Sequence, residues 1–404
     1  MNGVELLAIP MQTPAAADQI YSGVARQAGV LWATRHRAAP GRLADTVVVV
    51  VHPSSNFLGH YALPWLAAEG ADAVGMTTRY IGNDSALLLE NCVLDVGSVV
   101  RHLRNEGYRQ VVLMGNSGGG GLVALYQEQA ENPTITGPPG GGPPDLTAAD
   151  LPPADALVLA MAHPGRAGLL TEWLDPAVVD EHDPTRRDDD LDMFRPRNGP
   201  PYAPGFLAAY RAAQQARNDR ITAWASDRLD RLSGPADLPF LVHGTCADPR
   251  FLDLDIDPSD REPGTLWGDA YAANLQPTGL AHFTTLRSWL SQWSRTRSNG
   301  HGPLRLRGVG VPVHVIYGTA DQGCFPSHAR ELFDAVPHDR RTLTAIHGGR
   351  HYLNGRPDLA RRLAEIVLDR CRGADTPAST GPVRGQAPES EPATPPARRP
   401  SNGT

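Results

Sequence analysis

Residues 110–121 read Gln110-Val111-Val112-Leu113-Met114-Gly115-Asn116-Ser117-Gly118-Gly119-Gly120-Gly121. The opening apolar run is typical of a strand buried inside a parallel sheet, and the residues after the serine are compatible with a helix. A serine between such a strand and helix sits on a strained turn, where glycines two residues away on either side avoid collisions. The stretch therefore predicts a nucleophilic Ser117. The alternative is a glycine-rich helix start or a phosphate-binding loop.

Strands and helices alternate on both sides of this stretch. Before it we expect a strand at Thr46–Val51, a helix at 61–69, a strand at 71–77 and a helix at 85–106. After it we expect strands at 156–161, 313–317 and 341–346, and helices at 326–335 and 357–370. This alternation predicts an α/β fold with a mostly parallel, doubly wound sheet.

Residues 164–303 break the alternation. They mix acidic clusters, Pro/Gly turns and two expected helices at 206–231 and 279–295, which indicates a cap-like insertion. Residues 373–404 are rich in Pro, Ser, Thr and Gly, a composition typical of a disordered tail. We therefore expect one catalytic α/β domain over 1–372, a cap over 164–303 and a tail over 373–404. The insertion's own core is expected to contain Trp173, Phe194, Tyr202, Trp224 and Trp267.

Composition excludes several classes of function. The 404 residues carry a formal net charge of -7, which provides no basic surface for nucleic acid. No apolar run is long enough to cross a bilayer, and the first residues do not resemble a secretory signal, so a cytoplasmic location without membrane contact is expected.

The usage of two residue types narrows the chemistry further. The chain has no lysine, which excludes a Walker-A loop, a lysine Schiff base and pyridoxal-phosphate attachment. The four cysteines are scattered without a Cys-x-x-Cys pair, which indicates neither a zinc site nor a disulfide framework.

A nucleophilic serine needs a histidine base, and the histidine needs an acid that holds its tautomer. The chain resembles the α/β-hydrolase superfamily at Gly115–Gly119, at Tyr317-Gly318-Thr319-Ala320-Asp321 and at Gly348-Gly349-Arg350-His351. The resemblance covers roughly 46–162 and 310–371. It implies the chain order serine, acid, histidine, with Asp321 as the acid and His351 as the base.

Each of these two positions has a competitor. His347 is an alternative base, but His351 follows the glycines that would let a loop bring it over the serine. Asp248 ends a segment, Phe240–Asp248, that resembles Val313–Asp321 and offers an alternative acid. We favour Asp321 because one helix and one strand separate it from His351, which places the two on neighbouring loops. Asp321 could also simply cap the following helix.

The same resemblance implies an oxyanion hole. Gly118 would supply one backbone N–H group. The second would come from the loop after Thr46–Val51, where the family commonly has His-Gly-x and this chain has His52-Pro53-Ser54. Proline has no N–H group, so Ser54 is the expected donor, with Ser55 in reserve. Further side chains expected to contact the substrate are His52, Ser55, Asn116, His163 and Arg166. His163 and Arg166 could bind an anionic group, or they could belong to the scaffold.

These observations predict a serine hydrolase that transfers an acyl group to water from a small-molecule ester, thioester, lactone or amide. No metal or organic cofactor is required by this chemistry. Carbon–carbon bond hydrolysis is an alternative, because Gly-Asn-Ser-x-Gly-Gly also resembles the turn of meta-cleavage-product hydrolases. A biosynthetic acyltransferase or thioesterase is equally compatible with the same residues. A non-catalytic binding protein on this scaffold is the alternative from another class. The substrate and the oligomeric state stay open.

Overall fold

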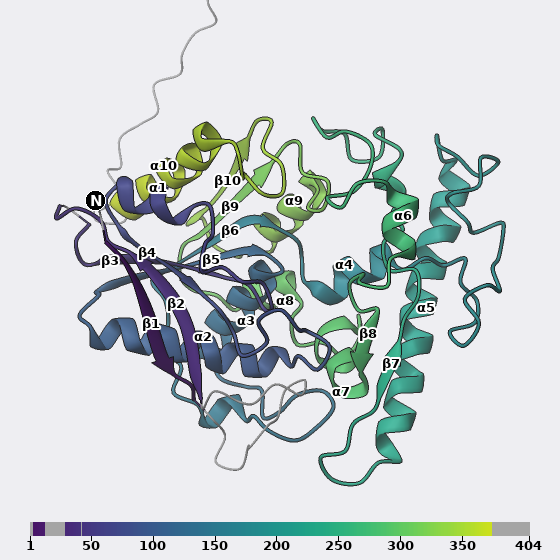
Figure 1. The fold of residues 1–404 in the computed structure, drawn as a ribbon, viewed down its shortest axis with the longest axis horizontal. Coiled ribbons are helices and arrows are strands. Elements are labelled where there is room, and N and C mark those ends of the chain that lie inside the picture. The colour runs from purple at the N-terminus through teal and green to yellow at the C-terminus, as the bar shows by residue number, and fades with distance from the viewer. Residues whose placement is uncertain (1–2, 13–28, 42, 374–404) are drawn as a thin grey trace, which may run out of the picture.

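The core of the protein is an eight-stranded sheet, seen in a computed structural model that describes residues 3–12, 29–41 and 43–373 (Figure 1). The strand order is β1-β2-β4-β3-β5-β6-β9-β10. The strands are β1 (Val4–Pro10), β2 (Val30–His36), β3 (Thr46–Val51), β4 (Asp72–Met76), β5 (Gln110–Ser117), β6 (Ala156–Ala162), β9 (Val313–Gly318) and β10 (Arg341–Ile346).

The six strands from β4 to β10 in this order run parallel, and β2 runs antiparallel to both of its neighbours. Every residue of β3 is buried, as expected for a β-branched strand that is covered on both faces. Parallel strands end at one edge of the sheet, so the loops that follow β3, β5, β6, β9 and β10 lie together there.

Helices cover both faces of the sheet. The helices α1 (Leu63–Ala68) and α10 (Pro357–Gly373) pack on one face. The other face is covered by α2 (Leu89–Asn105), α3 (Gly119–Glu131), α8 (Gly302–Leu306) and α9 (Pro326–Ala335). The predicted fold class, a mostly parallel and doubly wound α/β sheet, is confirmed.

The hairpin of β1 and β2 was not expected from the sequence. β1 forms an exposed edge of the sheet. Its sequence, VELLAIP, is largely aliphatic, yet Ile9 is the one buried residue of the strand. In β2 buried and less buried residues alternate along Val30–His36, but the sequence VLWATRH does not alternate between apolar and polar residues.

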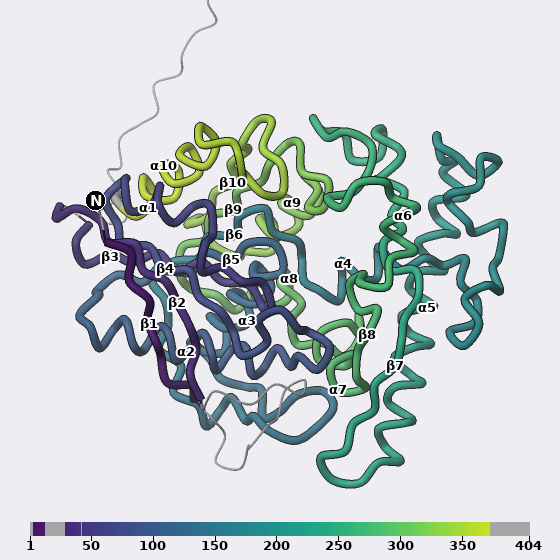
Figure 2. Tube along the Cα trace, in the orientation of Figure 1, coloured from purple at the N-terminus to yellow at the C-terminus, as the bar shows by residue number. Residues whose placement is uncertain are grey.

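Residues 164–303 contribute no strand to the main sheet and lie beside it as the teal-to-green part of the chain in Figure 2. They form α4 (Arg166–Trp173), α5 (Pro204–Asp230), η2 (Pro249–Phe251), α6 (Ala270–Leu275) and a two-stranded sheet of β7 (Pro239–Leu241) and β8 (Phe283–Thr285). The single helix expected at 279–295 is wrong. That segment is β8, a short α7 (Leu286–Ser288) and the π-helical η3 (Trp289–Trp293).

The remaining short element, η1 (Leu146–Ala148), lies in the connection before β6. All of the expected tail beyond Gly373 lies outside the described residues. Within the described ranges, none of the helices has both the length and the apolar character that a bilayer crossing requires.

Candidate active site

Ser117 occupies a sharp turn between β5 and α3. Its φ is +55°, in the left-handed region that L-residues rarely adopt, which indicates local backbone strain. Close packing explains the glycines around it, because a Cβ atom at Gly119 would lie 2.0 Å from the Val51 carbonyl oxygen. A Cβ atom at Gly115 would lie 2.4 Å from the carbonyl oxygen of Gly119. The chain has the α/β-hydrolase fold. The turn that carries Ser117 stands at the carboxyl edge of the sheet, where that fold has its nucleophile.

Asp321 and His351 meet at the same edge. Asp321 lies in the loop after β9, and His351 lies in the loop after the neighbouring strand β10. The Nδ1 atom of His351 is 2.9 Å from Oδ2 and 3.1 Å from Oδ1 of Asp321. Asp321 also accepts the backbone N–H groups of Gly323 and Cys324 at 2.7 and 2.9 Å, which hold the carboxylate in place. Both side chains are buried.

A cavity of about 170 Å³ is shared by His351 and the serine. Ser117, Gly118 and His351 all line it. The insertion also contributes walls, among them Trp173, Trp267 and Trp293. Trp173 also packs in a buried cluster with Phe251, as expected, whereas Trp267 is 45% exposed and its expected place in the insertion's core is wrong. No local signal in the sequence marks these three residues, because loops far apart along the chain bring them to the serine.

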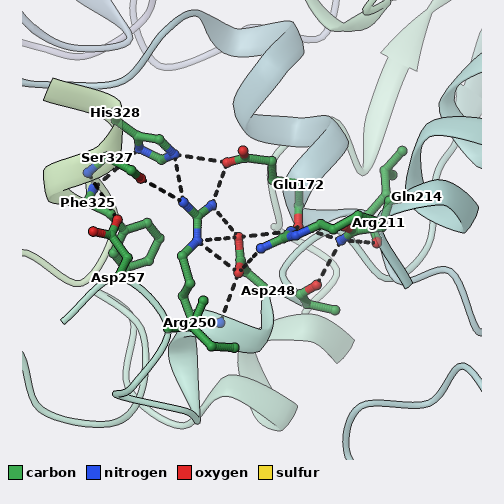
Figure 3. A network of polar contacts seen from close by, with 12 residues as sticks. Glu172, Arg211, Gln214, Asp248, Arg250, Asp257, Phe325, Ser327 and His328 are labelled. Atoms are coloured by element: carbon green, nitrogen blue, oxygen red, sulfur yellow. Dashed lines mark hydrogen bonds and ion pairs between the residues drawn. The ribbon is translucent and has the colours of Figure 1, made fainter. Parts of the chain in front are cut away.

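The alternative base, His347, is exposed and does not line this cavity. Asp248, the alternative acid, lies instead in a buried network of ion pairs between the insertion and α9 (Figure 3). It is bound by Arg211 Nη2 at 2.7 Å and by Arg250 Nη2 at 2.6 Å. Burial raises the pKa of Asp248, but the two guanidinium groups outweigh that effect and the pKa is lowered. In the described structure Asp248 makes no contact with His351, and its ion pairs are those of a residue that holds the fold together.

Arg250 connects this network to the main domain. It pairs with Glu172 of α4 and lies with its guanidinium carbon 4.2 Å from the centre of the Phe325 ring. His328 of α9 contacts both partners, with Nε2 2.9 Å from Glu172 Oε2 and 3.2 Å from Arg250 Nη1. Buried charges of this kind are tolerated only when they are paired. The network therefore fixes how the insertion lies on α9, behind the cavity wall that contains Trp173.

The loop after β3 places the imidazole of His52 beside the turn that carries Ser117. The N–H groups of Ser54 and Ser55 donate to His52 Nδ1 at 3.1 and 2.9 Å, so its Nε2 atom carries the proton. Burial, aided by the nearby Arg166, lowers the pKa of His52 well below its usual value. His52 is thus a neutral donor at pH 7. Its Nε2 atom would lie 3.0 Å from a Cβ atom placed on Gly118.

His163, which follows β6, is arranged in the same way. Its Nδ1 atom accepts the N–H group of Gly165 at 3.2 Å, and burial lowers its pKa well below the usual value. Its Nε2 atom would lie 3.5 Å from the same Cβ position on Gly118. His52, Ser55, His163 and Arg166 line the cavity as expected for substrate contacts. Asn116 does not, because it is fully buried in β5 and donates to the Ala160 carbonyl oxygen at 2.8 Å.

Among the described residues, one group of side chains has the spacing of a metal site, and it comprises Asp321, Cys324 and His351. Burial and the neighbouring Asp321 raise the pKa of the Cys324 thiol well above its usual value. A metal ligand must be a thiolate, so this thiol is a poor ligand at neutral pH. His351 and Asp321 already contact each other through the atoms that would bind an ion.

Searches found no family model and no curated protein that matches this sequence. Solved structures with a similar trace include an esterase domain from Rhodothermus marinus, with 11% identity, a TM-score of 0.45 and coverage of 92% of this chain and 98% of that one. A proline iminopeptidase from Mycobacterium smegmatis has 14% identity, a TM-score of 0.45 and coverage of 92% and 100%. A monoacylglycerol lipase from Paleococcus ferrophilus has 13% identity, a TM-score of 0.43 and coverage of 84% and 99%. At these values no property of those proteins is transferred to this chain.

Proposed function

We propose that the protein is a serine hydrolase that cleaves a small ester, thioester, lactone or amide through an acyl-enzyme on Ser117. The observation that carries the proposal is the joint placement of Ser117 and His351 on one cavity, with Asp321 2.9 Å behind His351 Nδ1. A serine on a strained turn, a histidine beside it and an acid behind the histidine are the parts of a nucleophilic acyl-transfer site.

In this mechanism His351 removes the proton from the Ser117 hydroxyl as the serine attacks the carbonyl carbon. Asp321 keeps the Nδ1 proton of His351 directed away from the serine and stabilises the imidazolium that forms. His351 then gives the proton to the leaving group. Water attacks the acyl-enzyme in the second half-reaction, and His351 again serves as the base.

Two hydrogen-bond donors are proposed to stabilise the oxyanion. The first is the N–H group of Gly118, at the start of α3. The expected second donor, the Ser54 N–H group, is engaged with His52 Nδ1. We therefore favour the Nε2–H group of His52 over Ser54, because it faces Gly118 and is held there by the bonds to Nδ1.

Active-site titration with a fluorophosphonate tests this proposal. We expect one equivalent of label on wild-type protein and none on Ser117→Ala, together with a fall in kcat of about 10⁴-fold or more on an activated ester. The variant should keep its circular dichroism spectrum and melting temperature. A wild-type protein that is folded, unlabelled and inactive on esters would overturn the proposal and favour a ligand-binding protein.

The same assay separates the related enzyme classes. Labelling at Ser117 without ester turnover would point to carbon–carbon bond hydrolysis. Turnover that rises when alcohols or amines are added as acceptors would point to an acyltransferase. A panel of esters and thioesters of different acyl length then identifies the preferred acyl group.

A further inference from the structure

Two residues that line the active-site cavity each carry a buried N–H group without a hydrogen-bond partner within the described residues. These groups are Nε of Arg166 and Nε1 of Trp173. The Arg166 side chain is 5% exposed, the whole of Trp173 is 1% exposed, and both residues line the cavity that contains Ser117. Buried donors in folded proteins nearly always have a partner, so unpaired ones at a ligand cavity indicate where a ligand supplies the acceptor.

The other contacts of Arg166 keep its guanidinium group in place. Its Nη2 atom pairs with Asp84, and its Nη1 atom donates to the Ser54 hydroxyl at 3.3 Å. The guanidinium carbon lies 4.2 Å from the centre of the Trp293 ring. The Asp84 side chain is 30% exposed, so water screens its charge more than that of Arg166. The cavity side of the pair is therefore the positive side.

The rest of the cavity wall lacks negative charge. Among the described residues that line it, none is an aspartate or a glutamate. His52 and His163 add neutral imidazoles whose Nε2–H groups lie around Gly118. A wall with one cation, several N–H donors and no carboxylate is complementary to a ligand with anionic oxygen atoms.

The size of the cavity limits the ligand. Its volume of about 170 Å³ lies below the range of drug-sized ligand pockets and close to the ~150 Å³ of an engineered cavity that holds one benzene molecule. A short acyl chain of a few carbon atoms fits this space. The Cγ atom of Arg166 would lie only 3.5 Å from a Cβ atom on Gly118, so the cation is close to the nucleophile turn.

We propose that the acyl group of the substrate is a short dicarboxylic half-acid, such as a succinyl or glutaryl group, whose free carboxylate binds Arg166 Nε and Trp173 Nε1. This inference rests on the proposed function and specifies its substrate class. Ser117 attacks the esterified carbonyl carbon, the bond to the leaving oxygen or sulfur breaks, and water releases the free diacid. The distal carboxylate takes no part in bond making and positions the acyl chain.

The test compares esters that differ only at the distal group. The mono-p-nitrophenyl esters of succinic and glutaric acid are measured against the corresponding amides and the alkyl esters of equal length. We expect kcat/KM to be about 10- to 100-fold higher for the acids than for the amides, the size of a charge-assisted hydrogen bond. Equal or faster hydrolysis of the amides or alkyl esters by wild-type protein would overturn the inference.

Variants then assign the preference to the two donors. Trp173→Phe removes Nε1 and keeps an aromatic ring, and we expect the acid-to-amide ratio to fall several-fold. Arg166→Gln should bring the ratio close to one. Arg350→Gln removes an exposed arginine, paired with Glu262 outside the cavity, and should keep the wild-type ratio. A ratio that drops equally in Arg350→Gln would show long-range attraction and overturn the assigned site. Should Arg166→Gln not fold, the wild-type series and Trp173→Phe decide the matter.

Fluorophosphonate labelling separates failure of this inference from failure of the proposed function. Protein that is labelled at Ser117 and hydrolyses neutral esters better than acidic ones keeps the proposed function and loses the substrate class. For protein that is not labelled, calorimetry with glutarate and its monoamide measures the anion site directly. Tighter binding of glutarate than of the monoamide, lost in Arg166→Gln, would support the anion site, and equal binding would overturn it.

Discussion

Asp248 and Asp321 follow similar sequences, yet asparagine at the two positions should have opposite effects. Asp248 is fully buried and serves two guanidinium groups, so Asp248→Asn should destabilise the fold and leave kcat nearly intact. Asp321 holds His351, so Asp321→Asn should lower kcat by about 10⁴-fold and change stability much less.

The size of the stability effect follows from the contacts of Asp248. Its oxygen atoms accept Arg211 Nη2 at 2.7 Å, Arg250 Nη2 at 2.6 Å and the Arg250 backbone N–H group at 2.9 Å. Loss of one partner from a buried ion pair costs about 3–5 kcal/mol, because the remaining charge is left uncompensated. With an unfolding entropy of about 2.1 cal/mol/K per residue, a chain of 404 residues would lose about 4–6 °C in melting temperature.

The assay combines calorimetric melting with steady-state ester hydrolysis on both variants. Asp189→Asn is the matched control, because Asp189 pairs with Arg195 at the surface with its side chain 51% exposed. Its free energy of unfolding should change by less than about 0.5 kcal/mol. A loss of activity in Asp248→Asn at an unchanged melting temperature would refute this reasoning and make Asp248 the acid of the active site.

Three further predictions follow from the same structure. His52→Ala should lower kcat by about 10²- to 10³-fold if its Nε2–H group binds the oxyanion, while Ser55→Ala should change kcat little. Full activity of His52→Ala would mean that a backbone N–H group is the second oxyanion donor. Gly119→Ala should lower the free energy of unfolding by about 1–3 kcal/mol, because its Cβ atom would lie 2.0 Å from the Val51 carbonyl oxygen. Gly168 has open space around it, so Gly168→Ala should not lower that free energy, and equal melting temperatures of the two variants would contradict this. Lowering the pH from 6.5 to 4 should reduce stability by up to ~1.4 kcal/mol per pH unit for each half-buried or buried histidine whose pKa is strongly lowered, since the unfolded chain binds the proton first. Urea unfolding at pH 7 and pH 5 measures this, and equal values would refute it. These histidines are His52, His60, His163 and His314, of which His60 and His314 have pKa values of about 4.

The sequence alone predicted the central sheet and the sharp turn that carries Ser117. Continuous apolar runs such as Thr46–Val51 admit few alternatives, because only a strand covered on both faces can bury them. The glycines around Ser117 indicate the turn just as directly, since the turn leaves no room for Cβ atoms at these positions. The order of Ser117, Asp321 and His351 came from resemblance to a known fold, and the structure brings the last two within 2.9 Å.

Only the tertiary structure distinguished Asp321 from Asp248 by environment. The two local sequences are alike, but β9 lies in the main sheet beside β10, while β7 pairs with β8 in a separate small sheet. Strand pairing joins residues far apart along the chain and leaves little local signal. The antiparallel edge pair of β1 and β2 also escaped prediction, because that pairing is a contact between separate segments and the apolar run of β1 is mostly exposed.

The tertiary structure also determined which residues form the walls of the cavity. Arg166 and Trp173 begin and end α4, whereas Trp293 lies in η3, so their meeting with Ser117 at one cavity depends on how the insertion packs on the main domain. Apolar periodicity and glycine spacing are local properties and determine elements and turns. The direction in which a side chain faces after packing depends on contacts between distant residues. The sequence therefore offered Arg166 as an anion-binding candidate, but the two unpaired N–H donors of cavity-lining residues emerge only from the folded chain.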